Sequence, residues 1–132
     1  MLFIWFLSVH GFGVTELARR TRLFALEVLR LSDVLPGNPG ARAIANQLAR
    51  SGTSVAANYR AALRARSSAE FRAKLQVAME EADESHFWIG LIQQAGYVEA
   101  VALERIEREA NELTAILVAS LKTARRGVSS GR

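Results

Sequence analysis

Residues 47–84, QLARSGTSVAANYRAALRARSSAEFRAKLQVAMEEADE, decide the fold of this chain. Each half of the stretch carries apolar and small residues at helical spacing, which predicts two helices. Between the halves, Ser67-Ser68-Ala69-Glu70 is a capping-box pattern. In this pattern the serine hydroxyl accepts from the Glu70 N–H while the Glu70 carboxylate reaches back towards the cap. The second helix is therefore expected to start at Ser67, and Gly96 is a natural stop for it.

Two further helical segments flank this stretch. The sequence LPGNPG at 35–40 ends a helix that begins near residue 15, because proline disfavours helix in the residue before it. Asn38 can cap the next helix with Pro39 in its first turn. The predicted helices cover about residues 15–35, 39–65, 68–95 and 98–126. Their inner stripes are expected to include Phe24, Val28, Leu48, Val55, Leu75, Ile89, Leu113 and Leu117.

Four helices with short connections predict one all-α domain, an antiparallel up-down-up-down four-helix bundle over residues 15–126. Residues 127–132, GVSSGR, are expected to form a disordered tail. Gly52 lies inside a predicted helix, where glycine is unfavourable. Close approach of a neighbouring helix explains it; phosphate contact through its backbone is the alternative, although interior N–H groups are already bonded. The absence of cysteine excludes disulfides, thiolate metal sites and cysteine nucleophiles.

Residues 1–14, MLFIWFLSVHGFGV, form an apolar extension without lysine or arginine. A secretory signal needs a positive start and a small-residue cleavage site, and neither is evident. The apolar run is also shorter than the roughly 20 residues that span a bilayer. One interpretation is a misplaced start, with Val14 as the true first residue; a short docking or membrane-contact segment is the other. We expect no membrane partner and a cytoplasmic location.

Charge is segregated along the chain. Residues 15–74 hold eleven basic and four acidic residues, a net +7, whereas residues 75–121 hold two basic and nine acidic residues, a net −7. At about 100° per residue, one quadrant of the helix at 39–65 carries four arginines, opposite its apolar stripe. A one-sided arginine face is typical of a protein that binds a polyanion. The candidate nucleic-acid-binding residues are Arg42, Arg50, Arg60 and Arg64.

An alternative interpretation of this face is a solvated surface neutralised by acids of a neighbouring helix or a neighbouring protomer. The acids that could do so are Glu80, Glu81, Asp83 and Glu84. In that case the chain is a structural or protein-interaction module with no role in nucleic-acid binding.

Phe87, Trp88 and Leu91 fall off the inner stripe of the helix at 68–95. Large apolar groups outside the inner face indicate a partner surface, so we expect an oligomer interface there. A core stripe that widens near the helix end is the alternative, and a base-stacking platform is a third.

Catalytic and metal sites have little support. Asp83 and His86 loosely resemble the Glu-x-x-His of di-iron bundles, but that chemistry needs two such motifs. No Ser-His-Asp arrangement, phosphate-binding loop or zinc spacing is present. We therefore expect no enzyme activity, no cofactor and no metal.

Two segments, QLARSGTSVAANYRAALRARSSAEF and KLQVAMEEADESHFWIGLI, carry a family pattern: a small-residue helix leads through Ala57-Asn58 into a Ser-x-x-Glu-Phe helix start. On these segments the chain resembles the four-helix-bundle family of the 23S rRNA intervening-sequence proteins, from residue 15 to about residue 125. The accessory proteins of diversity-generating retroelements are a related branch. The family often has an acid just after the Ala-Asn pair, where this chain has alanines. Pattern positions are occupied by Arg50, Ser51, Ser54, Ala57, Asn58, Ser67, Glu70 and Phe71.

The resemblance implies a ring-like homo-oligomer, a pentamer in the family. In the retroelement branch the ring is basic and associates with nucleic acid and a reverse transcriptase. For this chain the implied partners are further copies of itself, RNA or DNA, and a reverse transcriptase in a retroelement context. Sequence and resemblance together favour a non-enzymatic, oligomeric nucleic-acid-binding protein, with RNA as the preferred ligand.

Overall fold

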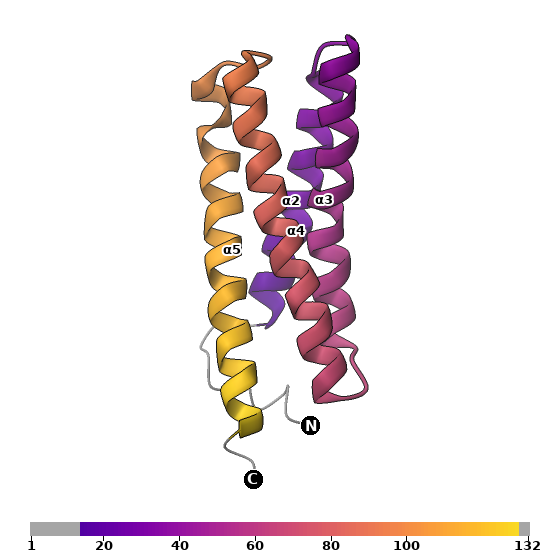
Figure 1. Cartoon of the computed structure of the whole chain (residues 1–132), viewed down its shortest axis with the longest axis vertical. Coiled ribbons are helices and arrows are strands. Elements are labelled where there is room, and N and C mark those ends of the chain that lie inside the picture. Colours follow the sequence, from indigo (N-terminus) through magenta and orange to yellow (C-terminus); the bar gives the residue numbers. More distant parts are fainter. Residues whose placement is uncertain (1–13, 130–132) are drawn as a thin grey trace.

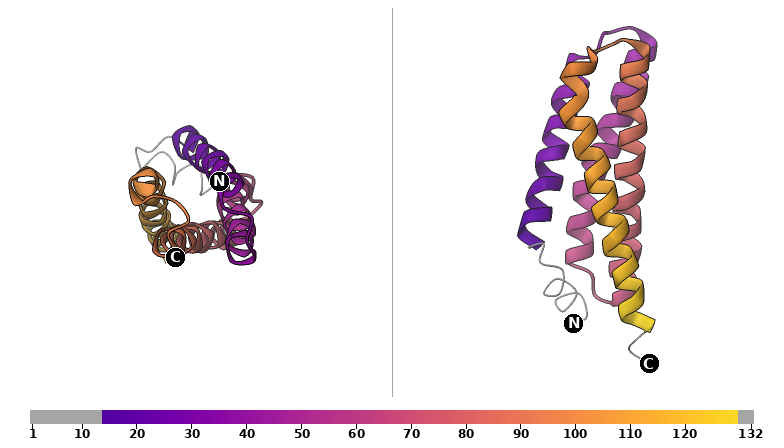
Figure 2. Two further views of the ribbon diagram at one scale, coloured as in Figure 1. Left: turned by 90° about the horizontal axis from the view of Figure 1, so that it is seen from above. Right: turned by 90° about the vertical axis from the view of Figure 1, so that its left-hand side faces the viewer.

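The computed structural model describes residues 14–129, which form four helices in an antiparallel up-down-up-down bundle (Figure 1). The helices are α2 (Val14–Val34), α3 (Pro39–Leu63), α4 (Ser68–Ala95) and α5 (Ala100–Ser129). Helices adjacent in sequence pack closely, whereas α2 and α5 meet more sparsely. Seen from above, the helices follow one another around the bundle in the order α2, α3, α4 and α5 (Figure 2).

The predicted fold class is confirmed, and the helix bounds differ by a few residues. Helix α3 ends at Leu63 and α5 begins at Ala100, each two residues inside the predicted bounds. Helix α5 continues to Ser129, so a tail that starts at 127 is wrong for its first three residues. One glycine costs about 1 kcal/mol in a helix and does not by itself end one. Residues 1–13 and 130–132, which include most of the extension, lie outside the described residues.

The predicted caps are present. The Asn38 side chain accepts from the Ala41 N–H at 2.9 Å, and Ser67 Oγ accepts from the Glu70 N–H at 3.1 Å. The return bond differs from the expected box, because Glu70 Oε2 accepts from the Arg66 N–H at 3.3 Å. Gly96 ends α4 with φ of 73°, a left-handed conformation that favours glycine.

The core follows the predicted stripes. Phe24, Val28, Leu48 and Val55 are buried, and so are Leu75, Ile89, Leu113 and Leu117. Two buried serines link the middle of the bundle, since the hydroxyls of Ser51 on α3 and Ser85 on α4 lie 2.9 Å apart. Ser85 Oγ donates to the Glu81 carbonyl of its own helix at 2.8 Å, and the Ser51 hydroxyl can donate either to Ser85 Oγ or to the Leu48 carbonyl at 3.3 Å. The pair therefore satisfies its own hydrogen-bonding needs without water.

Gly52 lies where α3 packs closely against α2. A Cβ atom at this position would lie 2.5 Å from Val28 Cγ1 and 2.7 Å from Val28 Cγ2. The expected role of Gly52, close approach of a neighbouring helix, is therefore confirmed.

None of the helices between residues 14 and 129 is long and apolar enough to cross a membrane.

Candidate nucleic-acid interface

The four candidate arginines of α3 are all exposed, but they do not form one patch. Arg42 lies in the first turns of α3, and Arg60 and Arg64 lie at its other end. With a rise of about 1.5 Å per residue, Arg42 and Arg60 are roughly 27 Å apart along the helix. The periodicity of one helix places residues on one side of it, but it does not make them neighbours along its length.

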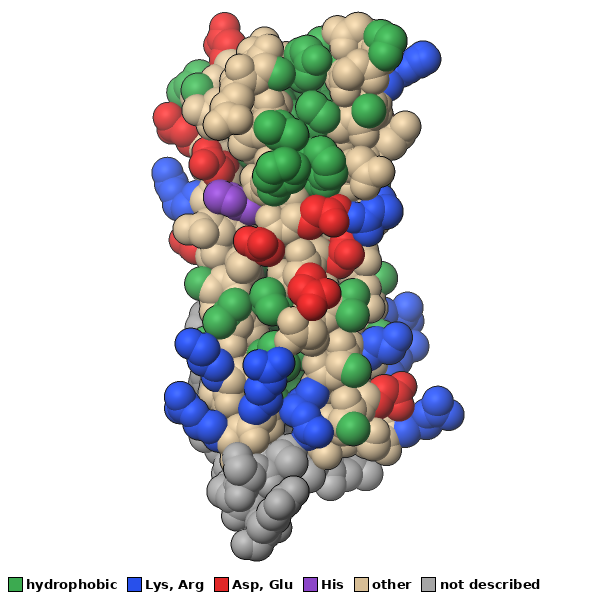
Figure 3. Space-filling model, in the orientation of Figure 1, with side chains coloured by type: hydrophobic (Ala, Val, Ile, Leu, Met, Phe, Trp, Pro, Cys, Tyr) green, Lys and Arg blue, Asp and Glu red, His purple; other side chains and the backbone are tan. Residues whose placement is uncertain are grey.

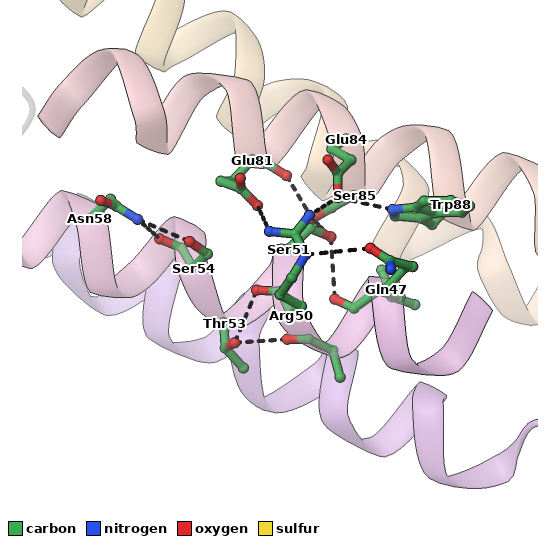
Figure 4. Close-up of polar contacts among 12 residues, drawn as sticks. Gln47, Arg50, Ser51, Thr53, Ser54, Asn58, Glu81, Glu84, Ser85 and Trp88 are labelled. Atoms are coloured by element: carbon green, nitrogen blue, oxygen red, sulfur yellow. Dashed lines mark hydrogen bonds and ion pairs between the residues drawn. The ribbon is translucent and has the colours of Figure 1, made fainter. Parts of the chain in front are cut away.

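Arg50 is neutralised within the chain. Its Nη1 atom donates to Glu81 Oε2 at 2.9 Å, and its Nη2 atom forms an ion pair with Glu84 on the same helix, α4 (Figure 4). Trp88 Nε1 donates to Glu84 Oε2 at 3.1 Å, so this carboxylate has two partners. The alternative interpretation, neutralisation by acids of a neighbouring helix, therefore holds for Arg50.

Arg60 and Arg64 belong to a larger concentration of positive charge at one end of the bundle. We define the basic end as residues 14–24, 55–76 and 118–129, where α2 and α4 begin and α3 and α5 finish (Figure 1). These segments contain eleven basic and two acidic residues, a net charge of +9. The rest of the described chain contains five basic and eleven acidic residues, a net charge of −6. Figure 3 shows the lysines and arginines gathered towards this end of the visible face.

Most of this charge is not cancelled by local acids. Glu16 pairs with Arg19, and Glu70 lies 3.7 Å from Arg66. Arg20 pairs across the bundle with Glu109 and Glu112 of α5. Within residues 14–129, no ion pair or side-chain hydrogen bond engages Arg22, Arg60, Arg64, Lys74 or Lys122.

A groove of about 600 Å³ between α2 and α3 opens within the basic end. Arg22 of α2 and Arg60 of α3 both line it, together with Arg19. None of the described residues that line it is acidic; they are Ala18, Arg19, Thr21, Arg22, Ala56, Ala57, Tyr59, Arg60 and Leu63. Arg22 was not among the candidate residues of the sequence analysis, because nothing in one helix's periodicity indicates that it lines a groove with Arg60 of another helix.

Tyr59 adds a neutral polar group to the groove. Its side chain is 4% exposed, and burial raises the pKa of the phenol to about 12. The Tyr59 hydroxyl has no hydrogen-bond partner within residues 14–129. The hydroxyl oxygen is not one of the fully buried unpartnered atoms, so it is available to a ligand in the groove that Tyr59 lines.

The seam on the other side of α2, between α2 and α5, is bridged by ion pairs. Arg20 bridges to α5 as described, and Arg105 Nη1 of α5 lies 2.8 Å from Glu27 Oε1 of α2. These pairs span the side of the bundle with the fewest contacts. Arg20 and Arg105 are therefore already occupied, in contrast to Arg22 and Arg60.

The three residues predicted for an oligomer interface have different surroundings. Trp88 is half-buried and packs against the core, as the widening-stripe interpretation expected. Phe87 is 55% exposed and meets the Trp88 ring edge-on at 5.0 Å between centroids. Leu91 is half-buried. Phe87 is thus the exposed apolar residue of the three, whereas Trp88 packs partly into the core.

His86 is the one histidine in the described part of the chain, and its Nε2 atom lies 3.9 Å from Glu107 Oε1. Between residues 14 and 129, no three His, Asp or Glu side chains are grouped closely enough to hold a metal ion.

Comparison with known proteins finds a matching family model and solved structures that match this chain. The model of the family described as 23S rRNA-intervening sequence protein matches residues 15–119. A crystal structure of a protein with unknown function from the S23 ribosomal protein family of Bacteroides thetaiotaomicron superposes with a TM-score of 0.76 at 29% sequence identity. The alignment covers 83% of this chain and 97% of that chain. Among curated proteins there is no match.

Proposed function

This chain belongs to the 23S rRNA-intervening sequence protein family, and from that premise we propose that it is a non-enzymatic, cytoplasmic protein that binds nucleic acid, preferably RNA. The family name associates its members with ribosomal RNA. The solved relative carries no assigned function, so the argument rests on the side chains of this chain.

The observation that carries the proposal is the set of unpaired basic side chains at the basic end. Arg60 of α3 and Arg64, which directly follows α3, are joined there by Arg22, Lys74 and Lys122 from the other three helices. Side chains without carboxylate partners are free to contact phosphates, and phosphate contacts supply most of the affinity for nucleic acid. The interface is therefore centred on the basic end rather than on the whole arginine face of α3, since Arg50 is engaged by Glu81 and Glu84.

A second candidate function is a protein-interaction module. The exposed Phe87 ring favours it, because water-exposed aromatic surface is a common mark of a protein interface. The two functions are compatible: a homo-oligomer formed through Phe87, Trp88 and Leu91 would bring several basic ends into one assembly. We propose such an oligomer, with a ring as its expected form.

The salt dependence of binding tests the RNA proposal. Log affinity falls with log salt by about 0.7 for each phosphate neutralised on a single strand and about 0.9 on duplex DNA. Arg60→Ala with Arg64→Ala should therefore weaken binding across sequences and flatten the slope by roughly 1.4 on single-stranded RNA. Fluorescence anisotropy at several salt concentrations measures both quantities.

A matched control removes the same charge at the other end of the bundle. Arg42 and Arg108 are exposed, and neither has an ion-pair partner within residues 14–129. Arg42→Ala with Arg108→Ala should change affinity and slope much less than the Arg60 and Arg64 pair. Equal effects of the two pairs, or no RNA binding by the unmodified protein at low salt, would contradict the proposal and favour the interaction module.

A further inference from the structure

We infer that the groove between α2 and α3 holds one nucleotide of an unpaired RNA strand, with its phosphate between Arg22 and Arg60. This inference rests on the proposed function and names the form of nucleic acid that the basic end recognises. It goes beyond general attraction to phosphates, because a concave site distinguishes an unpaired strand from a duplex.

The size and shape of the groove suit a small ligand. Its volume of about 600 Å³ falls within the range of typical ligand pockets, about 300–1,000 Å³. Small side chains on both helices, Ala18, Ala56 and Ala57, leave room for an inserted group. A duplex keeps its bases stacked inside and presents a convex outer surface, whereas an unpaired strand can turn a base and its sugar into such a hollow.

The charged groups of the groove fit a phosphate. Arg22 and Arg60 approach it from two different helices, and neither has a competing carboxylate within the described residues. Guanidinium groups bind phosphate oxygens with paired, directional hydrogen bonds, so two of them can grip one phosphate from both sides. Arg19 also lines the groove but keeps its bonds to Glu16 at 2.7 and 3.0 Å. Arg22 and Arg60 are therefore the phosphate-binding pair.

The neutral groups of the groove fit a sugar or a base. The Tyr59 hydroxyl lacks a partner among the described residues, and its high pKa keeps it protonated and uncharged near neutral pH. It can donate a hydrogen bond without repelling a nearby phosphate. Thr21 Oγ1 donates to the Ala18 carbonyl at 3.1 Å, which leaves its lone pairs able to accept. A ribose hydroxyl both donates and accepts, and could use both neighbours.

Ala57→Leu tests the inference because it fills the groove without changing charge. Ala57 is exposed and leucine is a good helix former, so the fold should tolerate the change. We expect affinity for a short unstructured RNA strand to fall about tenfold and affinity for an RNA duplex of equal length to stay within about twofold, by anisotropy at one salt concentration. Ala43→Leu is the matched control: Ala43 is exposed on α3, outside the groove, and its change should leave both affinities unaltered.

Tyr59→Phe separates hydrogen bonding from charge. It should lower single-strand affinity about fivefold while leaving the salt slope unchanged, because it removes a neutral donor only. Circular dichroism of each variant verifies that the helices are intact.

The outcomes separate the inference from the function on which it rests. If the unmodified protein binds RNA but Ala57→Leu binds single strands equally well, the groove inference is wrong and the RNA proposal stands. If Ala57→Leu instead breaks up a homo-oligomer in light scattering, the groove seats a second copy and the inference is overturned. If the unmodified protein binds neither single strands nor duplexes, both proposals fail.

Discussion

Replacing Gly52 by alanine should destabilise the bundle, although alanine is the better helix former by about 1 kcal/mol. The new methyl group would lie 2.5, 2.7 and 2.8 Å from Cγ1, Cγ2 and Cβ of Val28. Val28 is fully buried, and a β-branched side chain in a helix has one strongly preferred rotamer, so it cannot turn away. The two helices must therefore move apart.

The size of the effect follows from these opposing contributions. Overpacking a core typically costs about 1–3 kcal/mol. Since all three contacts are shorter than real Cβ contacts, we place Gly52→Ala at the upper end, about 3 kcal/mol. Subtracting the helix preference leaves a net loss of about 2 kcal/mol in the free energy of unfolding. For a chain of this length the melting temperature should fall by roughly 8 °C.

Urea denaturation followed by circular dichroism measures this loss, and two further variants make the test specific. Gly90→Ala is the control, because a Cβ at Gly90 meets nothing within 4 Å, and it should stabilise α4 by up to about 1 kcal/mol. Val28→Ala leaves a cavity that the methyl of Gly52→Ala partly fills, so the double variant should be about 2 kcal/mol more stable than additivity predicts. A Gly52→Ala protein as stable as the unmodified one would refute the close-approach argument.

Three other predictions follow from the caps, the aromatic surface and the buried phenol. Ser67→Ala should lower the free energy of unfolding by about 1 kcal/mol and Glu70→Ala by less, and chemical denaturation of the double variant should show non-additive losses because both cap one helix start. Trp88→Glu should shift the proposed oligomer towards monomer in light scattering, since it buries an unpaired charge, and Phe87→Glu, at a more exposed position, should do so without unfolding the bundle. The pKa of Tyr59 is raised from 10.0 to about 12, so the folded state keeps a proton that the unfolded state loses. Its contribution to stability is complete below about pH 10 and is lost as the pH rises towards 12; denaturation midpoints of Tyr59→Phe should lack this component of the fall.

The sequence predicted the fold well because the spacing of apolar residues within each helix indicates which face is buried. The spacing of Leu48 and Val55 determines which side of α3 faces inward, and no knowledge of the other helices is needed. The sequence signals for the helix starts were equally local, since the side chains of Asn38 and Ser67 accept from N–H groups three residues away. The end of α5 was missed because Gly127 resembles a helix stop, whereas one glycine costs only about 1 kcal/mol and does not by itself end a helix.

The candidate site was harder to predict because it depends on how helices rotate and slide against one another. The side of α3 that carries Arg60 was correctly placed at the surface, yet its neighbour Arg22 comes from α2. Arg50 lies on the same side, but the acids of α4 reach it and not Arg60. These differences arise from the axial position of each residue relative to the next helix, which a single-helix pattern does not contain.

The separation of charge between the two ends gives this bundle an electric dipole along its long axis, so an electric field orients it. Helix α5, with 30 residues, is about 45 Å long, several times the Debye length of about 8 Å at physiological salt. A polyanion would therefore attract the near, positive end, while the distant, negative end lies beyond its screened field and cancels little of this attraction. In the proposed complex, bundles that arrive on one strand should all point the same way, and the strand would align neighbouring copies in parallel.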